Sequence, residues 1–186
     1  MWQYNYNYVS NELYHYGVPG MKWGQRRRMR LESRVEKRYS KYGKKAGMAD
    51  YYKKQGEQVY KKHDANAKVL DKQAKQFESQ GRYLRAEAVR KAAAALRSRG
   101  ANLKAKQDSQ AKKYELKAEK LKEKASTYAS KKRVDLGKSR LNSIISSSKQ
   151  KGYDKVARNE ERAKEREMEE RLGERGYSAY NKVRGK

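Results

Sequence analysis

Cysteine does not occur in this 186-residue chain, proline occurs once and histidine occurs twice. Without cysteine, the chain has no disulfide, no thiolate nucleophile and no cysteine-based metal site. The two histidines, His15 and His63, are far apart in the sequence, and a single histidine without partner ligands cannot hold a metal ion. We also find no glycine-rich phosphate loop and no catalytic constellation. The sequence therefore predicts a non-enzymatic protein with no cofactor and no metal.

Long hydrophobic runs are missing as well. Only 35% of the residues are hydrophobic, and the mean hydropathy is −1.36. No stretch approaches the ~20 apolar residues of a membrane span, and the first residues, where Tyr alternates with Gln and Asn, do not resemble a secretory signal. A large dry core cannot be built from this composition. We expect a soluble protein with no membrane partner, located in the cytoplasm or inside an assembled particle.

Acidic residues are few relative to basic ones. The chain has 49 Lys and Arg against 22 Asp and Glu, which gives a formal net charge of +27. A helix that lysines merely keep soluble does better with balanced signs, so this excess predicts an anionic partner. The basic residues are spread along predicted helices, which suits contact with nucleic-acid phosphates without reading of bases. The candidate nucleic-acid-binding residues are Arg26, Arg27, Arg28, Arg30, Arg34, Arg38, Lys44 and Lys45.

Tyrosines are interleaved with these cations at 39, 42, 51, 52, 60 and 83. Two interpretations apply to them. They can stack on the bases of a single strand, or they can fill a helix seam, which is the commoner use of aromatic residues at helical spacing.

A short segment near the N-terminus differs in composition from everything after it. Residues 15–27 contain three glycines and the only proline of the chain. Val18-Pro19-Gly20 has the residue types of a type II turn, so we expect a tight bend at 17–20. The bend would gather Met21, Trp23 and two tyrosines into a small apolar knob of the kind that anchors interfaces. Either this knob docks onto a partner, or it caps the first helix of the protein itself. The candidate docking residues are His15, Tyr16, Gly17, Gly20, Met21, Lys22, Trp23 and Gly24.

This segment resembles a known pattern, His-aromatic-Gly-Val-x-Gly-Met-Lys-Trp-Gly-x-Arg-Arg. The pattern recurs near the ends of otherwise unrelated virion and head-morphogenesis proteins of tailed bacteriophages and prophages. Pro19 stands where lysine is commoner, and Gln25 where an aliphatic residue is commoner. The resemblance covers residues 15–27 only. It implies a phage context and a docking signal, for which we expect a capsid or portal component as partner, but it implies no fold for the remainder.

The rest of the chain is rich in strong helix formers and lacks proline after residue 19. It predicts an all-α, elongated protein, a coiled-coil-like hairpin of long helices with a flexible aromatic N-terminal arm and possible self-association. The expected ranges are 1–11 (arm), 12–27 (docking motif), 26–45 (basic helix, with a break at Gly43 and Gly47), 48–133 (helical hairpin turning near 98–102), 134–152 (serine-rich connector with a short apolar patch), 153–175 (charged helix) and 176–186 (tail).

Two spacings underlie the hairpin. Positions 59, 70, 81, 92, 103, 114, 125 and 136 suggest an eleven-residue period. Ala111, Ala118 and Ala125 follow a seven-residue period in its second half. Gly81 either separates two helices or marks a close contact within one.

Three functions fit these features. The first is a structural protein inside a phage particle that docks through the motif and contacts packaged nucleic acid. The second is a capsid scaffold or assembly protein. The third is a sequence-nonspecific nucleic-acid-binding protein outside the particle. Because scaffolds are often acidic, the charge of +27 favours the first over the second.

Overall fold

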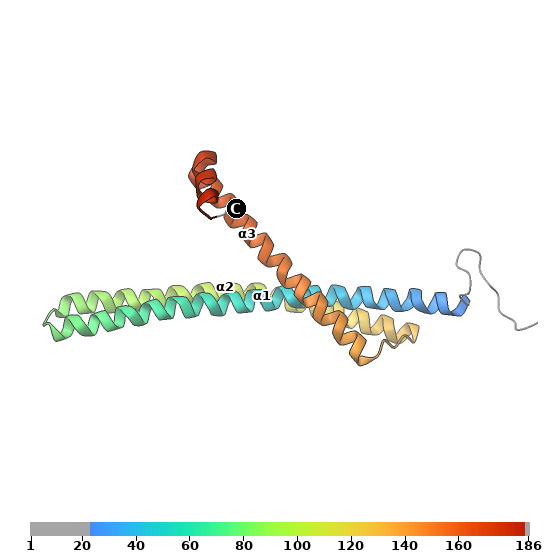
Figure 1. Ribbon diagram of the computed structural model, residues 1–186. Helices are drawn as coiled ribbons and strands as arrows, with labels where there is room; N and C mark the ends of the chain where they lie inside the picture. The colour runs from blue at the N-terminus through green and yellow to red at the C-terminus, as the bar shows by residue number, and fades with distance from the viewer. Residues whose placement is uncertain (1–22, 185–186) are drawn as a thin grey trace, which may run out of the picture.

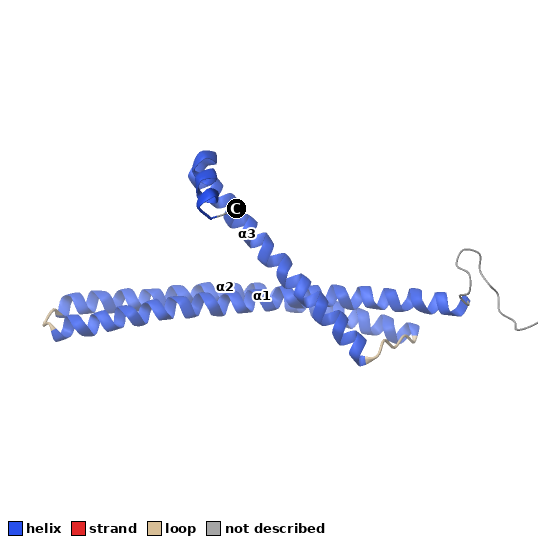
Figure 2. Ribbon diagram, in the orientation of Figure 1, coloured by secondary structure: helices blue, strands red, loops and turns tan. Residues whose placement is uncertain are grey.

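A computed structural model describes the backbone of residues 23–184 and the side chains of residues 24–172. Over this range the protein consists of three long α-helices without strands (Figures 1 and 2). They are α1 (Trp23–Ser79), α2 (Tyr83–Lys132) and α3 (Lys138–Arg184). Helices α1 and α2 form an antiparallel hairpin, and α3 crosses α1 and then leaves the hairpin at a steep angle (Figure 1). The all-α, elongated fold expected from the sequence is confirmed. None of the described helices contains a segment long and apolar enough to cross a membrane.

The seam between α1 and α2 is built from very small residues. In α2 the buried positions follow a seven-residue spacing with one longer step: Ala86, Ala93, Gly100, Ala111, Ala118 and Ala125. In α1, Gly56, Ala67 and Ala74 are buried in the same way. Such small residues let two helices approach closely, but each adds little buried apolar area. The hairpin is therefore a slender structure held by a long, thin seam.

Each helix contains one eleven-residue step within the seven-residue pattern, from Gly56 to Ala67 in α1 and from Gly100 to Ala111 in α2. A Cβ at Gly100 would lie 2.8 Å from the Cβ of His63, so the two steps lie opposite each other. An eleven-residue step is four residues longer than a heptad, and such an insertion locally unwinds a left-handed coiled coil. The continuous eleven-residue period expected from the sequence is wrong, since Ala92 and Leu103, which belong to it, are exposed.

The hairpin turns at residues 80–82, and the turn expected near 98–102 is wrong. Gly81 has φ +73°, and the N–H of Arg82 donates to the carbonyl of Phe77 at 2.8 Å. The N–H of Gly81 also donates to the carbonyl of Glu78 at 2.9 Å, which completes a Schellman ending of α1. Gly100 instead lies buried within α2, because His63 leaves no room for a side chain there.

Glycines also set the crossing of α1 and α3. A Cβ at Gly43 would lie 2.8 Å from the carbonyl oxygen of Ile145, and one at Gly47 would overlap the carbonyl oxygen of Lys149. From the other helix, a Cβ at Gly152 would overlap the carbonyl oxygen of Lys44. Small residues four apart on each helix thus let the two backbones touch. The expected helix break at Gly43 and Gly47 is wrong: both lie inside α1, where they make room for α3.

The C-terminal third is more helical than its sequence suggests. The expected connector, 134–152, is a loop only up to Gly137, because the serine-rich patch forms the first turns of α3. There it packs on α1, with Ser148 buried and its hydroxyl hydrogen-bonded to that of Ser40 at 2.9 Å. The expected tail, 176–186, is also helical as far as Arg184. The expected arm at 1–11 and the bend at 17–20 lie outside the described residues.

Candidate nucleic-acid interface

The side of α1 that faces α3 carries the acidic residues of its N-terminal half. Glu32 and Glu36 are the only acidic residues between positions 23 and 49. The guanidinium group of Arg140 on α3 lies 3.2 Å from a carboxylate oxygen of Glu32 and 2.6 Å from one of Glu36. Arg28 pairs with Glu32 as well, at 3.1 Å. On this side of α1, opposite charges are therefore matched.

The side of α1 that faces α2 has a different character. A groove of about 500 Å³ lies there between the N-terminal part of α1 and the C-terminal part of α2. We call it the basic groove, and it is lined by Arg34, Lys37, Arg38, Lys41, Leu121, Lys124 and Tyr128. No acidic residue is among the lining side chains. None of its five cations forms an ion pair within the described part of the chain. The basic groove is thus a concave surface of one sign.

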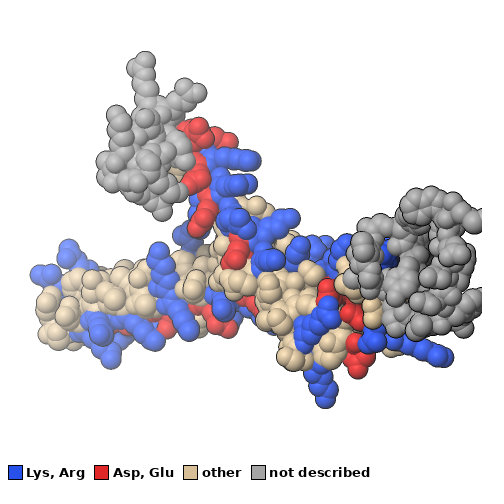
Figure 3. Space-filling view, turned by 45° about the vertical axis from the view of Figure 1, so that its right-hand side comes forward, with Lys and Arg blue, Asp and Glu red and all other residues tan. Residues whose placement is uncertain are grey.

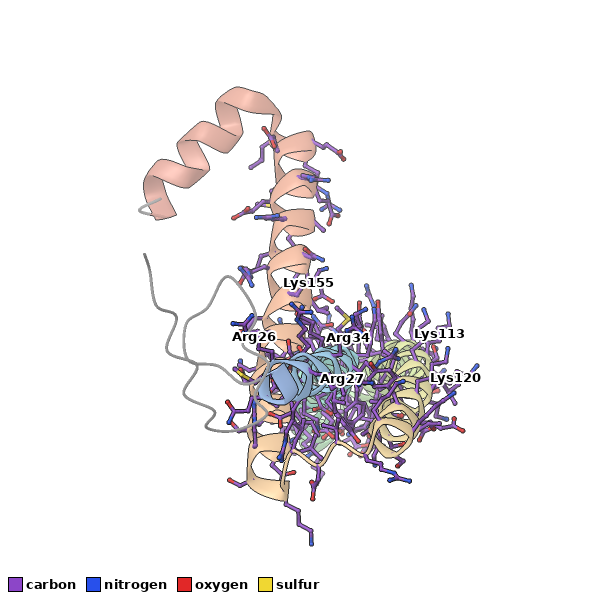
Figure 4. All side chains as sticks on the ribbon, turned by 90° about the vertical axis from the view of Figure 1, so that its right-hand side faces the viewer. Arg26, Arg27, Arg34, Lys113, Lys120 and Lys155 are labelled. Atoms are coloured by element: carbon purple, nitrogen blue, oxygen red, sulfur yellow. The ribbon has the colours of Figure 1, made fainter. Side chains whose placement is uncertain are left out.

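Helical spacing explains how the groove arises. Arg34, Lys37, Arg38 and Lys41 are three, four and seven residues apart, so they share one face of α1. On α2 the same spacing places Lys113, Lys117, Lys120 and Lys124 along one face. Arg34 and Lys113 extend on the same side of the hairpin when it is viewed along its axis (Figure 4). Of the α2 stripe only Lys124 lines the groove, where it lies across the valley from the four cations of α1.

Inside the groove, an aromatic ring and a guanidinium group form a pair. The guanidinium carbon of Arg38 lies 4.1 Å from the ring centroid of Tyr128. Tyr128 is half-buried, as is Leu121. The groove therefore has an apolar floor and a cationic rim.

A second hollow, of about 400 Å³, lies next to the start of α1. We call it the end hollow, and it is lined by Gly24, Arg27, Arg28, Leu31, Glu32, Lys132, Arg133 and Val134. Arg133 has φ 51° and ends α2 as a left-handed cap, which brings the last basic residues of α2 beside α1. Positive charge thus continues from the basic groove to the N-terminal end of the hairpin.

The hairpin and α3 differ in charge pattern on the face seen in Figure 3. Lys and Arg cover much of the hairpin, while acidic and basic side chains alternate along α3 (Figure 3). Examples of pairing on α3 are Arg171 with Glu167 at 2.7 Å and Lys149 with Asp50 of α1 at 3.3 Å. Ion pairs such as that of Lys53 with Glu115 also occur on the hairpin, whereas the cations of the basic groove form none within the described part of the chain.

The structure divides the predicted nucleic-acid-binding residues into groups. Arg34 and Arg38 line the basic groove, and Arg27 and Arg28 line the end hollow. The remaining predicted residues lie outside both hollows: Arg26, Arg30, Lys44 and Lys45. Lys45 instead turns toward α2, with its ammonium nitrogen 5.3 Å from the ring centroid of Tyr114.

Of the predicted docking residues, those from His15 to Lys22 lie outside the described residues. Trp23 is the first residue of α1, and Gly24 is exposed with open space around its Cα. The first helix therefore begins within the motif, at Trp23, three residues before the expected start of the basic helix at residue 26.

Several tyrosines act as packing residues. The rings of Tyr52 and Tyr114 stack with centroids 5.6 Å apart, joining α1 to α2. Tyr51 meets Tyr153 of α3 edge to face at 4.9 Å, and its hydroxyl donates to Glu160 at 2.8 Å. Burial, followed by the nearby carboxylate of Glu160, raises the pKa of Tyr51 above its ordinary value. Burial likewise raises the pKa of Tyr52. The interpretation as seam residues is confirmed for these two tyrosines.

His63 lies against Gly100 in the seam. Among the described residues, no three side chains of His, Asp or Glu gather where they could hold a metal ion.

Sequence reasoning missed the α2 half of the basic groove and two of its α1 residues, Lys37 and Lys41. A turn at 98–102 would have placed residues 34–41 opposite the C-terminal third of the chain. The turn at Gly81 instead places them opposite residues 121–128. The αL-tolerant glycine at 81 was the signal that could have found this pairing.

Residues 7–29 match a family of unknown function, DUF7211. The matched segment contains the whole motif, 15–27, and reaches into the first turns of α1. No curated protein and no solved structure matches the chain.

Proposed function

We propose that the protein is a non-enzymatic structural component of a tailed-phage particle that contacts nucleic acid through the basic groove. The observation that carries the nucleic-acid part is the groove itself, which five cations and no acidic side chain line. Cations held in a concave surface repel one another, and a polyanion relieves that repulsion. Phosphates supply such charge at regular intervals, and their counterions are released on binding.

The arrangement favours contact with the backbone of the nucleic acid over reading of its bases. Base reading in duplex DNA relies on side chains inserted into the major groove with matched donors and acceptors. The rim of the basic groove consists of Lys and Arg, which are donors only. We therefore expect binding that is indifferent to sequence and weakens steeply with salt.

A matched pair of variants tests this assignment. In the groove variant, Arg34, Lys37, Arg38 and Lys41 are all replaced by Gln. In the tip variant, four exposed lysines of the distal part of α1 are replaced by Gln: Lys61, Lys62, Lys72 and Lys75. Both variants lose the same charge, so a difference between them reports position rather than net charge.

The measurement is nucleic-acid affinity by fluorescence anisotropy over a series of salt concentrations. The groove variant is expected to flatten the log–log slope by about 0.7 to 0.9 per lost phosphate contact. The tip variant should change the slope much less. Equal slopes for the two variants would refute the groove assignment, and lack of binding by the intact protein at low salt would leave the scaffold function in its place.

The phage part of the proposal rests on the motif at 15–27. Its resemblance to virion and head-morphogenesis proteins supports docking onto a capsid or portal component, with Trp23 and Met21 as anchors. The test is to fuse residues 12–27 to a fluorescent protein and to measure its uptake into particles during infection. A Trp23→Ala fusion serves as control. We expect particles to take up the unchanged fusion and to exclude the Trp23→Ala fusion. Exclusion of both fusions, or equal uptake of both, would contradict docking.

A further inference from the structure

We propose that the basic groove binds a single strand rather than a duplex, and that Arg38 and Tyr128 form the platform on which a base stacks. This inference rests on the proposed contact with nucleic acid and adds the class of ligand. It comes from two features of the groove, its apolar floor and its place between two packed helices.

The floor distinguishes the two ligands. Leu121 and Tyr128, with the aliphatic stems of the surrounding Lys and Arg side chains, line the valley below the charged groups. A duplex presents phosphates outward and keeps the faces of its bases stacked inside, so it would touch the rim and leave the floor uncovered. A single strand exposes base faces that can cover such a floor while its phosphates meet the rim. The combination of floor and rim therefore matches a single strand.

The dimensions agree with this choice. The α1 wall extends from Arg34 to Lys41, which corresponds to a length of ~10.5 Å at ~1.5 Å per residue. This length accommodates about three nucleotides of a stacked strand at ~3.4 Å each. The facing wall belongs to α2, which the alanine seam draws close to α1. A valley between two packed helices is too narrow for a duplex to enter.

The Arg38–Tyr128 pair supplies the stacking surface. The guanidinium carbon of Arg38 lies 4.1 Å from the centroid of the Tyr128 ring, and Arg38 is an exposed residue. Guanidinium planes and tyrosine rings are both surfaces on which unpaired bases stack. A base can therefore lie on the guanidinium plane, or displace it and lie on the ring.

The experiment compares an oligothymidylate of about 15 nucleotides with the same strand paired to oligoadenylate. Four proteins are measured with both ligands: the intact protein and the variants Tyr128→Leu, Tyr128→Phe and Arg38→Lys. Tyr128→Leu keeps an apolar floor but removes the ring, and Arg38→Lys keeps the charge but removes the planar group. Circular dichroism verifies that each variant retains its helices.

We expect Tyr128→Leu to weaken single-strand binding about fivefold or more, in line with the loss of one stacked base. Arg38→Lys should weaken it in the same sense, Tyr128→Phe should leave it nearly unchanged, and duplex binding should not respond to any of the three. Equal losses for both ligands, or no loss in Tyr128→Leu and Arg38→Lys, would overturn the single-strand inference while leaving the proposed function standing. If the groove variant itself binds both ligands as the intact protein does, the proposed function fails first.

Discussion

The two sides of α1 differ in both packing and charge. Toward α3, backbones meet at Gly43 and Gly47, and the acidic residues Glu32 and Glu36 are paired with Arg140. Toward α2, the contact is a thin row of alanines, and the cations beside it have no acidic neighbours in the basic groove. One helix thus separates a charge-matched contact from a surface of one sign.

The difference shows how a uniformly basic sequence can yield a localised surface. Residues 26–45 read as an even run of cations with two acidic interruptions. Folding places both acidic residues within reach of Arg140 on α3, which forms ion pairs with each of them. The charged side chains of α1 that line the basic groove are then all cations, so positive charge is concentrated in that groove.

The largest effect is expected from Gly47→Leu, which disrupts the packing of α1 against α3. The new side chain would overlap the backbone of Lys149, and a backbone cannot move aside as a flexible side chain does. We expect a loss of about 3 kcal/mol or more in the stability of the crossing, at the upper end of overpacking effects. Because the chain has no cysteine, the crossing can be followed with the pair Ser40→Cys and Ser148→Cys, whose hydroxyl oxygens are 2.9 Å apart in the native protein.

This pair should form a disulfide rapidly under mild oxidation, and Gly47→Leu should abolish it. Gly24→Ala, at a glycine with open space around it, is the control and should leave cross-linking unchanged. Cross-linking that persists in Gly47→Leu would show that the glycine is not needed for the crossing.

A smaller effect is expected from overfilling the α2 side. Ala93 is fully buried in the seam, whereas its neighbour Ala92 is exposed. Ala93→Leu is expected to cost about 1–3 kcal/mol, while Ala92→Leu should stay within about 0.5 kcal/mol of the native protein. Urea denaturation followed by circular dichroism gives both values. Similar costs for the two variants would mean that the alanine spacing does not define the seam.

The smallest effect is the loss of stability at alkaline pH that we expect from Tyr51, which packs between α1 and α3. The pKa of Tyr51 is raised by burial and by Glu160, so the folded protein keeps the phenolic proton at a pH where the unfolded chain has lost it. The stability due to this group is present below about pH 10, the ordinary tyrosine value, and decreases as the pH rises further. The stability advantage of the native protein over Tyr51→Phe should therefore shrink above that pH. A difference that stays constant across the range would contradict the role of this hydroxyl.

The sequence predicts some of these features well and others poorly, for physical reasons. The helices follow from residue propensities, and Ala111, Ala118 and Ala125 predict the seam by their spacing. The roles of the glycines are harder to predict from the sequence, because the same residue type serves three purposes. Gly81 ends a helix, Gly47 makes room for the crossing helix, and Gly100 makes room for a histidine. Only the partner in space distinguishes these uses. The groove was missed for the same reason, since its two walls are about 80 residues apart in the sequence and meet only because the hairpin turns at Gly81.

The most direct test of the account is to ask which lysines nucleic acid covers. Lysine acetylation followed by mass spectrometry, with and without oligothymidylate, measures the protection of each side chain. We predict strong protection of Lys37, Lys41 and Lys124 in the basic groove, and little protection of Lys61, Lys72 and Lys75 in the distal part of α1. Uniform protection along the hairpin, or protection centred on the tip, would contradict the claim that the α2-facing side of α1 is the nucleic-acid interface.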